Sequence, residues 1–381
     1  MKKLKILELT NYSAGGCGVG ARVLQEAEML SKKHDVHIFS SYYEKGTNKI
    51  CSAEETKGKV KIKRFPALQP GLGILKYIPG GQSYMFWRFQ KEALEFKPDV
   101  IIAHAYRHPH TTQAIKIAKK LGAKLFLVTH APFLPERHLR KTLSEKLSVW
   151  FYDHLIAPIT LNKFDKIIAI TPWEIPILEK IGVKKEKIVL IPNGLKEEFF
   201  KNKAKSKEQS IILFMGRISP IKDLETLILS MNYIKDKTIK INIIGPAEPQ
   251  YLAKLKSLIK ENNLYSRVKI TDKVYTRKEQ IENLDSSKIY VLPSKSEAMP
   301  QTLIEAMARG KIVIASNNRG SSAIVQDRKT GYLFQVGNAQ NLAEKIDLAL
   351  SANQNNLKNA AKAYVKQFHW DILIKKLESL F

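Results

Sequence analysis

Two carboxylates stand eight positions apart in the second half of the chain, at Glu297 and Glu305. Pro300 lies between them, and proline is favoured in the first turn of a helix, where its missing N–H would have no partner. Apolar residues with helical spacing follow, and Gly310 is suited to end the helix. The stretch therefore predicts a strand at Ile289–Leu292, a loop that holds Glu297, and a helix that contains Glu305.

The start of this predicted helix, around Met299, Pro300 and Gln301, has the properties of an anion site. Unpaired backbone N–H groups and the helix dipole both favour a phosphate there. A ligand with phosphates at the helix start and hydroxyl groups on both sides would use the amides and both carboxylates. Two surface glutamates around an ordinary helix would show the same spacing, so other motifs must decide between a ligand site and an ordinary helix.

A second charged motif follows the apolar strand Ile211–Met215, where Gly216 and Arg217 come first and Lys222 closes a short turn. Two cations at the end of a strand suit a diphosphate, because arginine offers a planar fork and lysine a compact charge. Ion pairing at the surface is the alternative interpretation.

The chain opens with a strand at 5–10, a glycine-rich loop that includes Gly15 and Gly16, and an apolar helical pattern at 23–30. This order is typical of a Rossmann-like unit, in which glycines let a phosphate or sugar approach the backbone. Residues 16–21 also fit the dinucleotide fingerprint G-x-G-x-x-A. The next strand, however, ends in serines, with Glu44 as the nearest acid. An NAD(P)-dependent oxidoreductase therefore remains only the alternative function.

Histidines end two further predicted strands, His104 after 99–103 and His130 at the end of 124–129. Open α/β sheets bind ligands at the carboxyl ends of their strands. His130 is the first candidate for the site and His104 the second. His108 and His110 have no cysteine or carboxylate at ligand spacing, so we expect loop residues and not metal ligands.

Taken in order, these motifs resemble those of the retaining glycosyltransferases of family 4. The matching positions are Gly15-Gly16, His130, Asn193-Gly194, Arg217 with Lys222, and Glu297 with Glu305. The resemblance covers nearly the whole chain and implies an α/β fold of two Rossmann-like parallel-sheet domains facing across a cleft, the GT-B architecture. The implied domains are residues 1–194 and 195–363, with a terminal segment at 364–381 that returns to the first domain.

The resemblance also implies a reaction, the transfer of a hexose from a UDP- or GDP-linked donor to a hydroxyl group of a glycan or lipid-linked acceptor, with retention. Catalytic roles fall to His130 and Glu297 at the donor sugar and to Arg217 and Lys222 at the diphosphate. The donor would further contact Gly15, Gly16, Gly216, Met299, Pro300, Gln301 and, at the ribose, Glu305. We expect no metal and no other cofactor, since the chain has no obvious Asp-x-Asp motif.

Composition limits the remaining choices. A chain of 381 residues suits two domains, and 44% hydrophobic residues indicate a folded protein. The net charge of +27 predicts an anionic partner, although a lysine-rich surface alone would give the same excess. No motif combines stacking aromatics with basic residues, so nucleic acid is not expected. Two cysteines imply no disulfide framework and favour the cytoplasm.

Two segments raise the question of a membrane. A long helix predicted at 136–156 has an apolar stripe beside basic residues, and the stretch 71–87 is apolar and aromatic. Neither is long and apolar enough to span a bilayer, and the N-terminus lacks the features of a signal peptide. We expect a cytoplasmic protein, with peripheral docking on an anionic membrane as one interpretation of the helix and packing on its own sheet as the other.

Overall fold

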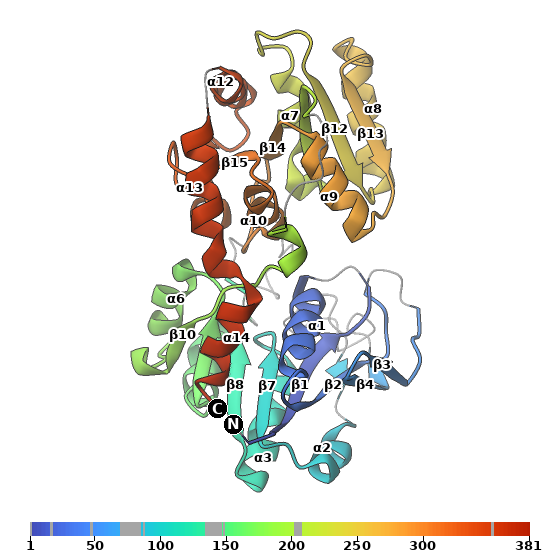
Figure 1. Ribbon diagram of the computed structural model, residues 1–381. Helices are drawn as coiled ribbons and strands as arrows, with labels where there is room; N and C mark the ends of the chain where they lie inside the picture. Colours follow the sequence, from blue (N-terminus) through green and yellow to red (C-terminus); the bar gives the residue numbers. More distant parts are fainter. Residues whose placement is uncertain are drawn as a thin grey trace. The chain divides into compact units, whose positions relative to one another are not determined.

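The computed structural model describes residues 2–15, 18–45, 49–68, 85–86, 88–133, 147, 149–201, 208–351 and 354–381. They form two α/β units, one of Met1–Gly194 with Trp370–Phe381 and the other of Leu195–His369. Each unit has a largely parallel sheet with helices beside it (Figure 1). The predicted fold class, with two parallel-sheet domains, is confirmed. The chain returns to the first unit at Trp370, later than the boundary at 364 in the sequence prediction.

The first unit holds an eight-stranded sheet in the order β10-β9-β8-β7-β1-β2-β4-β3, parallel except for the edge strand β3. Its strands are β1 (Lys5–Tyr12), β2 (Asp35–Ser41), β3 (Glu54–Lys57), β4 (Val60–Phe65), β7 (Val100–His104), β8 (Lys124–Val128), β9 (Lys166–Ala169) and β10 (Ile188–Leu190). A separate pair joins β5 (Ala67–Leu68) to β6 (Met85–Phe86). The main helices are α1 (Gly18–Leu30), α2 (Gln90–Phe96), α3 (Pro109–Leu121), α5 (Ala157–Leu161), α6 (Ile175–Lys180) and α14 (Trp370–Glu378).

The central strands of this sheet are buried because helices cover both faces (Figure 1). All five residues of β7 are buried, as are seven of the eight residues of β1. Such strands read as continuous apolar runs and not as alternating ones. The order reverses between β1 and β7, since the chain first adds β2 and β4 on one side of β1 and then β7, β8, β9 and β10 on the other. The carboxyl ends of β1 and β7 therefore form a topological switch point.

The second unit repeats this plan with six parallel strands in the order β13-β12-β11-β14-β15-β16. Its strands are β11 (Ile211–Met215), β12 (Lys240–Gly245), β13 (Val268–Asp272), β14 (Ile289–Leu292), β15 (Ile312–Ser316) and β16 (Tyr332–Phe334). The helices are α7 (Leu224–Ser230), α8 (Pro249–Glu261), α9 (Arg277–Ser286), α10 (Gln301–Ala308), α11 (Arg319–Ser322), α12 (Ala339–Leu350) and α13 (Asn355–Val365). The order reverses between β11 and β14, so these two strands define the switch point of the second unit.

The terminal helix α14 packs beside α1 in the first unit (Figure 1). Trp370 is 2% exposed, and its indole N–H donates a hydrogen bond to Gln25 Oε1 at 2.8 Å. The indole ring covers Gly194 so closely that a Cβ there would lie 2.3 Å from Cδ2 of the ring. The Asn-Gly pair of the sequence therefore has a packing role, because only glycine leaves room for Trp370.

Two helix predictions were wrong in detail. His110, which was predicted to be a loop residue, lies in the first turn of α3 and is fully buried, because that helix begins at Pro109. In the helix predicted at 136–156, residues 134–146 and 148 lie outside the described residues. Its last turn, Tyr152–Ile156, is a π-helix that continues into α5 and ends at Leu161.

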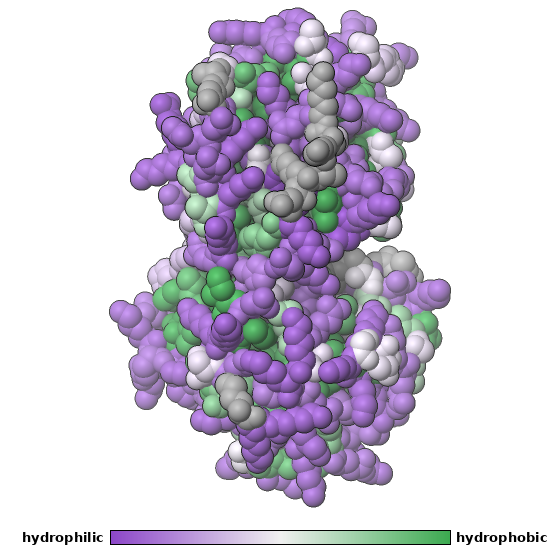
Figure 2. Space-filling view, in the orientation of Figure 1, coloured by the Kyte–Doolittle hydropathy of each residue, from purple (hydrophilic) through white to green (hydrophobic). Residues whose placement is uncertain are grey.

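The apolar and aromatic stretch predicted at 71–87 also lies outside the described residues, apart from residues 85 and 86. Over the ranges given above, no helix has the length and apolarity that crossing a membrane requires. The face drawn in Figure 2 is coloured mainly as hydrophilic.

We predict that Gly194→Ala lowers the free energy of unfolding, because the new methyl group must displace the Trp370 ring. Overpacking of this kind costs about 1–3 kcal/mol. Gly18→Ala is the matched control, since a Cβ there meets nothing within 4 Å. Urea unfolding of both variants measures the difference. Equal stability of Gly194→Ala and the control would contradict this account of the packing.

Candidate functional site

At the switch point of the second unit, two of the predicted site residues meet. Lys222 closes a 3-10 turn (Pro220–Lys222) after β11, and Glu297 lies in the loop after β14. The Lys222 Nζ and Glu297 Oε1 atoms are 2.6 Å apart, and both side chains are mostly buried. The fold thus brings a cation and a carboxylate together from positions 75 residues apart in the sequence.

The loop that carries Glu297 is held by the next strand and helix. A Cβ on Gly320, in α11, would lie 2.3 Å from the backbone oxygen of Glu297, so the two backbones are in direct contact. Asn318 Nδ2 donates to the Ser294 oxygen at 2.9 Å, and the Ser316 hydroxyl donates to the same oxygen. These contacts fix the loop, and with it the position of the Glu297 side chain.

Gly216 and Arg217 lie at the same edge of the sheet, directly after β11. Gly216 has φ +155, and a Cβ on Gly245 would lie 1.9 Å from the Gly216 oxygen. The loops after β11 and β12 therefore touch through their backbones. Arg217 is exposed, and its guanidinium makes no ion pair or hydrogen bond with any residue that the structure describes. Its charge is available to a ligand.

Helix α10 begins one residue later than predicted. Pro300 is the N-cap residue, with φ −73 and ψ 101, and Gln301 is the first helical residue. Met299, directly before the cap, is buried. The Gln301 Nε2 atom is buried and has no hydrogen-bond partner among the described residues. The amides of the first turn and this side-chain donor are suited to an anion or hydroxyl acceptor.

Glu305 lies inside α10, as predicted, but it already has protein partners. Its Oε1 accepts from Arg277 Nη1 at 2.8 Å, and its Oε2 accepts from Gln280 Nε2. Burial raises the pKa of this carboxyl group, while Arg277 acts in the opposite direction. A carboxylate has about four acceptor sites, so two remain for a ligand.

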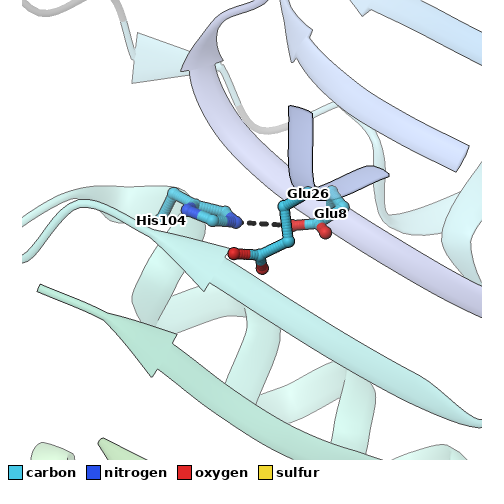
Figure 3. A group of neighbouring side chains, drawn as sticks. All are labelled: Glu8, Glu26 and His104. Carbon is cyan, nitrogen blue, oxygen red and sulfur yellow. Dashed lines mark hydrogen bonds and ion pairs between the residues drawn. The ribbon is translucent and has the colours of Figure 1, made fainter. Parts of the chain in front are cut away.

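At the switch point of the first unit, a fully buried polar cluster joins β1, α1 and β7. It consists of Glu8, Glu26 and His104, whose side chains point toward one another (Figure 3). His104 Nε2 and Glu8 Oε2 form a short hydrogen bond. Burial lowers the pKa of His104 to about 4 and raises the pKa of Glu8 well above its usual range.

These three residues are also the set most capable of holding a metal within the described ranges, with ligand atoms within 4.8 Å of one another. Arg22 Nη2, however, lies 2.9 Å from Glu26 Oε2, and the same guanidinium donates to the Ile191 oxygen and to Asn193 Oδ1. A buried guanidinium beside the carboxylates opposes a second cation. The charges of the cluster are therefore balanced by protons and by Arg22, and the site is poorly suited to a divalent metal ion.

The sequence analysis did not identify Glu8, Arg22 or Glu26. For Glu8, the available signal was a charged residue within an apolar strand. For Arg22 and Glu26, it was a pair of opposite charges four positions apart on the buried side of a helix. Neither signal names a partner, so the cluster could be recognised only in the fold.

His130, the first histidine candidate, lies directly after β8 and is half-buried. Its backbone is in the left-handed region, with φ +59, and Ala131 follows with φ +52. Glu174 Oε2 accepts a hydrogen bond from the Ala131 amide at 2.8 Å, which holds this turn. His130 Nε2 lies 2.9 Å from His104 Nδ1, so the structure brings both histidine candidates together. Burial lowers the pKa of His130 well below its usual value.

Gly15 has φ +86, and a Cβ there would lie 2.4 Å from the Lys45 backbone oxygen. This contact alone requires glycine, so the residue has a packing role whether or not a ligand approaches it. Gly16, the other predicted glycine of this loop, lies outside the described residues.

We predict that replacing His110 with phenylalanine changes how stability depends on pH. His110 Nε2–H donates to the His104 backbone oxygen at 2.8 Å, and burial lowers its pKa to about 4. Below about pH 6.5 the unfolded chain binds a proton at this position that the folded chain does not. The stability advantage of the unmodified protein over His110→Phe should therefore shrink by about 1.4 kcal/mol per pH unit between pH 6.5 and 4. Urea unfolding at several pH values measures this difference, and parallel curves for the two proteins would contradict it.

Comparisons with known protein families cover nearly the whole chain. A family model described as Glycosyltransferase Family 4 matches residues 16–199, and one described as Glycosyl transferases group 1 matches residues 196–367. An uncharacterized glycosyltransferase of Methanocaldococcus jannaschii is 27% identical over 100% of this chain and 99% of its own length.

A Campylobacter jejuni relative is 26% identical over 62% of each chain. It is described as an N,N'-diacetylbacillosaminyl-diphospho-undecaprenol alpha-1,3-N-acetylgalactosaminyltransferase.

Solved structures agree on the fold. Anabaena HepE in complex with UDP and glucose superposes with a TM-score of 0.73 at 17% identity, covering 99% of this chain and 98% of its own. Sucrose-phosphate synthase of Thermosynechococcus elongatus gives 0.76 at 19% identity with the same coverage. The chain has the GT-B fold and belongs to the family 4, group 1 glycosyltransferases, which transfer a sugar from a nucleotide-sugar donor.

Proposed function

We propose that this glycosyltransferase transfers a hexose, with retention at the anomeric carbon, from a UDP- or GDP-linked donor to a hydroxyl group of a glycan or lipid-linked acceptor. The observation that carries the proposal is the Lys222–Glu297 pair at the switch point of the second unit. In a nucleotide sugar the anionic diphosphate and the sugar hydroxyl groups are parts of one molecule. A lysine and a carboxylate 2.6 Å apart offer a partner to each part at the same place.

The diphosphate is the leaving group, and negative charge grows on it as the sugar departs. Lys222, the exposed guanidinium of Arg217 and the first amides of α10 provide positive electrostatic potential at this edge of the sheet. Fixed donors aimed at developing charge stabilise a transition state more than they stabilise the bound substrate. In this proposal they act in place of a metal ion, so the reaction is metal-independent.

The two glutamates bind the hexose and the ribose of the donor. Glu297 orients the hexose through its hydroxyl groups, once Lys222 has turned toward phosphate. Glu305 binds the ribose with the acceptor sites that Arg277 and Gln280 leave open. Gly216, Met299, Pro300 and Gln301 line the same edge and contact the donor, with the buried Gln301 amide as an unused hydrogen-bond donor.

In the first unit, His130 supports the reacting face of the sugar, and Gly15 and Gly16 contact the donor. The left-handed turn at His130 and the His104 hydrogen bond hold its ring in one orientation. Such fixed positioning is what a group near the reacting carbon requires. No residue is assigned as general base, because the departing phosphate can accept the proton of the acceptor.

An oxidoreductase that uses NAD(P), the alternative function, is not favoured. A dinucleotide site of this kind needs an acid at the end of the second strand to bind the ribose. Here β2 ends in Ser40 and Ser41, which are buried and hydrogen-bond to Ser13 and to the Asn11 oxygen. The glycine-rich loop also has a packing reason at Gly15, independent of a dinucleotide.

For the acceptor, we favour a lipid-linked molecule at an anionic membrane surface, with the protein peripheral on the cytoplasmic face. Five large apolar side chains near the end of the predicted amphipathic helix are each more than half exposed: Leu147, Trp150, Phe151, Leu155 and Ile159. Their spacing of three and four residues places them along one side of a helical segment. Basic residues precede them in the sequence, and the Campylobacter relative is named for an undecaprenol-linked acceptor.

We predict that Arg217→Ala lowers kcat by about 100- to 1000-fold, the scale seen when a fixed donor to transition-state charge is removed. The free energy of unfolding should change by less than about 0.5 kcal/mol, because the side chain is exposed. The assay uses the UDP- or GDP-sugar that most raises the melting temperature, with Lys269→Ala, an exposed lysine of the same unit, as the control. Full activity of Arg217→Ala would refute the role.

We predict that the unmodified protein keeps its rate of transfer in excess EDTA, because the reaction is proposed to need no metal ion. A loss of activity that added divalent metal restores would refute the metal-free reaction.

We predict that vesicles with anionic lipid bind the protein and that added salt releases it, as expected for apolar side chains beside basic residues. The double variant Trp150→Glu with Leu155→Glu should reduce binding at least tenfold in a sedimentation assay. Tyr265→Glu is the control, because Tyr265 is also more than half exposed but belongs to the second unit. Equal binding by the double variant and the control would remove the membrane part of the proposal.

A further inference from the structure

A chain of hydrogen bonds runs from the buried core of the first unit to His130. Glu8 Oε2 contacts His104 Nε2, and His104 Nδ1 lies 2.9 Å from His130 Nε2. His130 Nδ1, the far end of the chain, makes no hydrogen bond with any described residue. The chain of hydrogen bonds therefore begins at a side chain with no solvent exposure and ends at a ring nitrogen that has no partner among the described residues.

Only two arrangements of protons satisfy this chain when both histidines are neutral. If the Glu8 carboxyl group carries a proton, it donates to His104 Nε2, His104 donates from Nδ1–H to His130 Nε2, and His130 presents Nδ1–H. If Glu8 is ionised, every bond reverses, and His130 presents a bare Nδ1 that can only accept. One proton at Glu8 thus decides whether His130 offers its ligand a donor or an acceptor.

The surroundings of Glu8 favour the protonated form. Its second oxygen, Oε1, is buried and has no hydrogen-bond partner among the described residues, which costs more for a carboxylate than for a neutral acid. The nearest cation, Arg22, is already paired with Glu26 at 2.9 Å.

The other titratable groups at this end of the sheet are the imidazoles of His108 and His110 on the side of α3. The His108 ring contacts Asn11, and the His110 ring contacts the His104 backbone. Burial raises the pKa of Glu8 and lowers the pKa values of both relay histidines, which is the direction that favours the neutral form of each group.

We propose that Glu8 is a positioning residue whose carboxyl proton, acting through His104, fixes His130 as the Nδ1–H tautomer and so makes His130 a hydrogen-bond donor to an oxygen of the donor sugar. This inference rests on the proposed function, because it takes the sugar to be the ligand of His130. No proton moves along the chain in the resting protein. Its effect is to hold one tautomer and one ring orientation.

Nitrogen NMR of the histidine side chains tests the relay without an activity assay. The protein has nine histidines, so the signals of His104 and His130 can be assigned by replacing each in turn with glutamine. At pH 7 the unmodified protein is expected to show a proton on Nδ1 and none on Nε2 in both rings. A proton on Nε2 of His130 would overturn the proposal, and the tautomer itself is measured on the unmodified protein.

Variants of Glu8 then connect the tautomer to the reaction. Glu8→Gln keeps an N–H that can donate to His104, so His104 and His130 should each keep their proton on Nδ1. The kcat of this variant should stay within about threefold of the unmodified protein. Glu8→Leu removes the donor, and the signals should show mixed tautomers, with kcat about 10- to 100-fold lower and the KM for the donor sugar nearly unchanged. Thr10→Val is the matched control, since Thr10 is equally buried two residues further along β1 and its hydroxyl has no partner among the described residues.

The two proposals can fail separately. The expected tautomers in a protein that transfers no hexose would refute the proposed function and support the relay. Transfer that is unchanged in Glu8→Leu would refute the relay and leave the function standing.

Discussion

The reversal of strand order in each sheet is the constraint on which the candidate site depends. Helices cover the faces of both sheets, and the loops that follow neighbouring strands turn away from each other where the order reverses. That place lies between β1 and β7 in the first unit and between β11 and β14 in the second. The buried glutamate–histidine cluster stands at the first reversal, and the Lys222–Glu297 pair stands at the second.

Charge pairing explains why these groups can remain there without a ligand. An unpaired buried charge is strongly destabilising, whereas a paired one is nearly neutral in its effect on folding. Lys222 and Glu297 neutralise each other, and Arg22 neutralises Glu26 while it also binds the end of β10 and Asn193. A nucleotide sugar would exchange the first pair for two better-matched partners, phosphate for the lysine and hydroxyl groups for the carboxylate. The Arg22–Glu26 pair would keep its partners when the nucleotide sugar binds, which is consistent with a structural role.

Much of the fold could be predicted from the sequence, because parallel strands covered on both faces appear as unbroken apolar runs. Strands β11 and β14 were predicted to the residue for this reason. The environment of His110 was predicted wrongly, because Pro109 starts α3 and the helix carries His110 into the core. The contacts of the site could not be predicted, since nothing local to Lys222 or Glu8 shows which distant residue the fold will bring to it. The two family matches support the kind of reaction.

The most direct test of the account is a crystal structure of the protein with the UDP- or GDP-sugar that stabilises it most against heat. The account predicts that the diphosphate lies at the carboxyl ends of β11 and β14, within hydrogen-bond distance of Arg217 and of the first amides of α10, and that Lys222 has left Glu297 to contact phosphate. A diphosphate bound elsewhere, with the Lys222–Glu297 pair still intact, would contradict it.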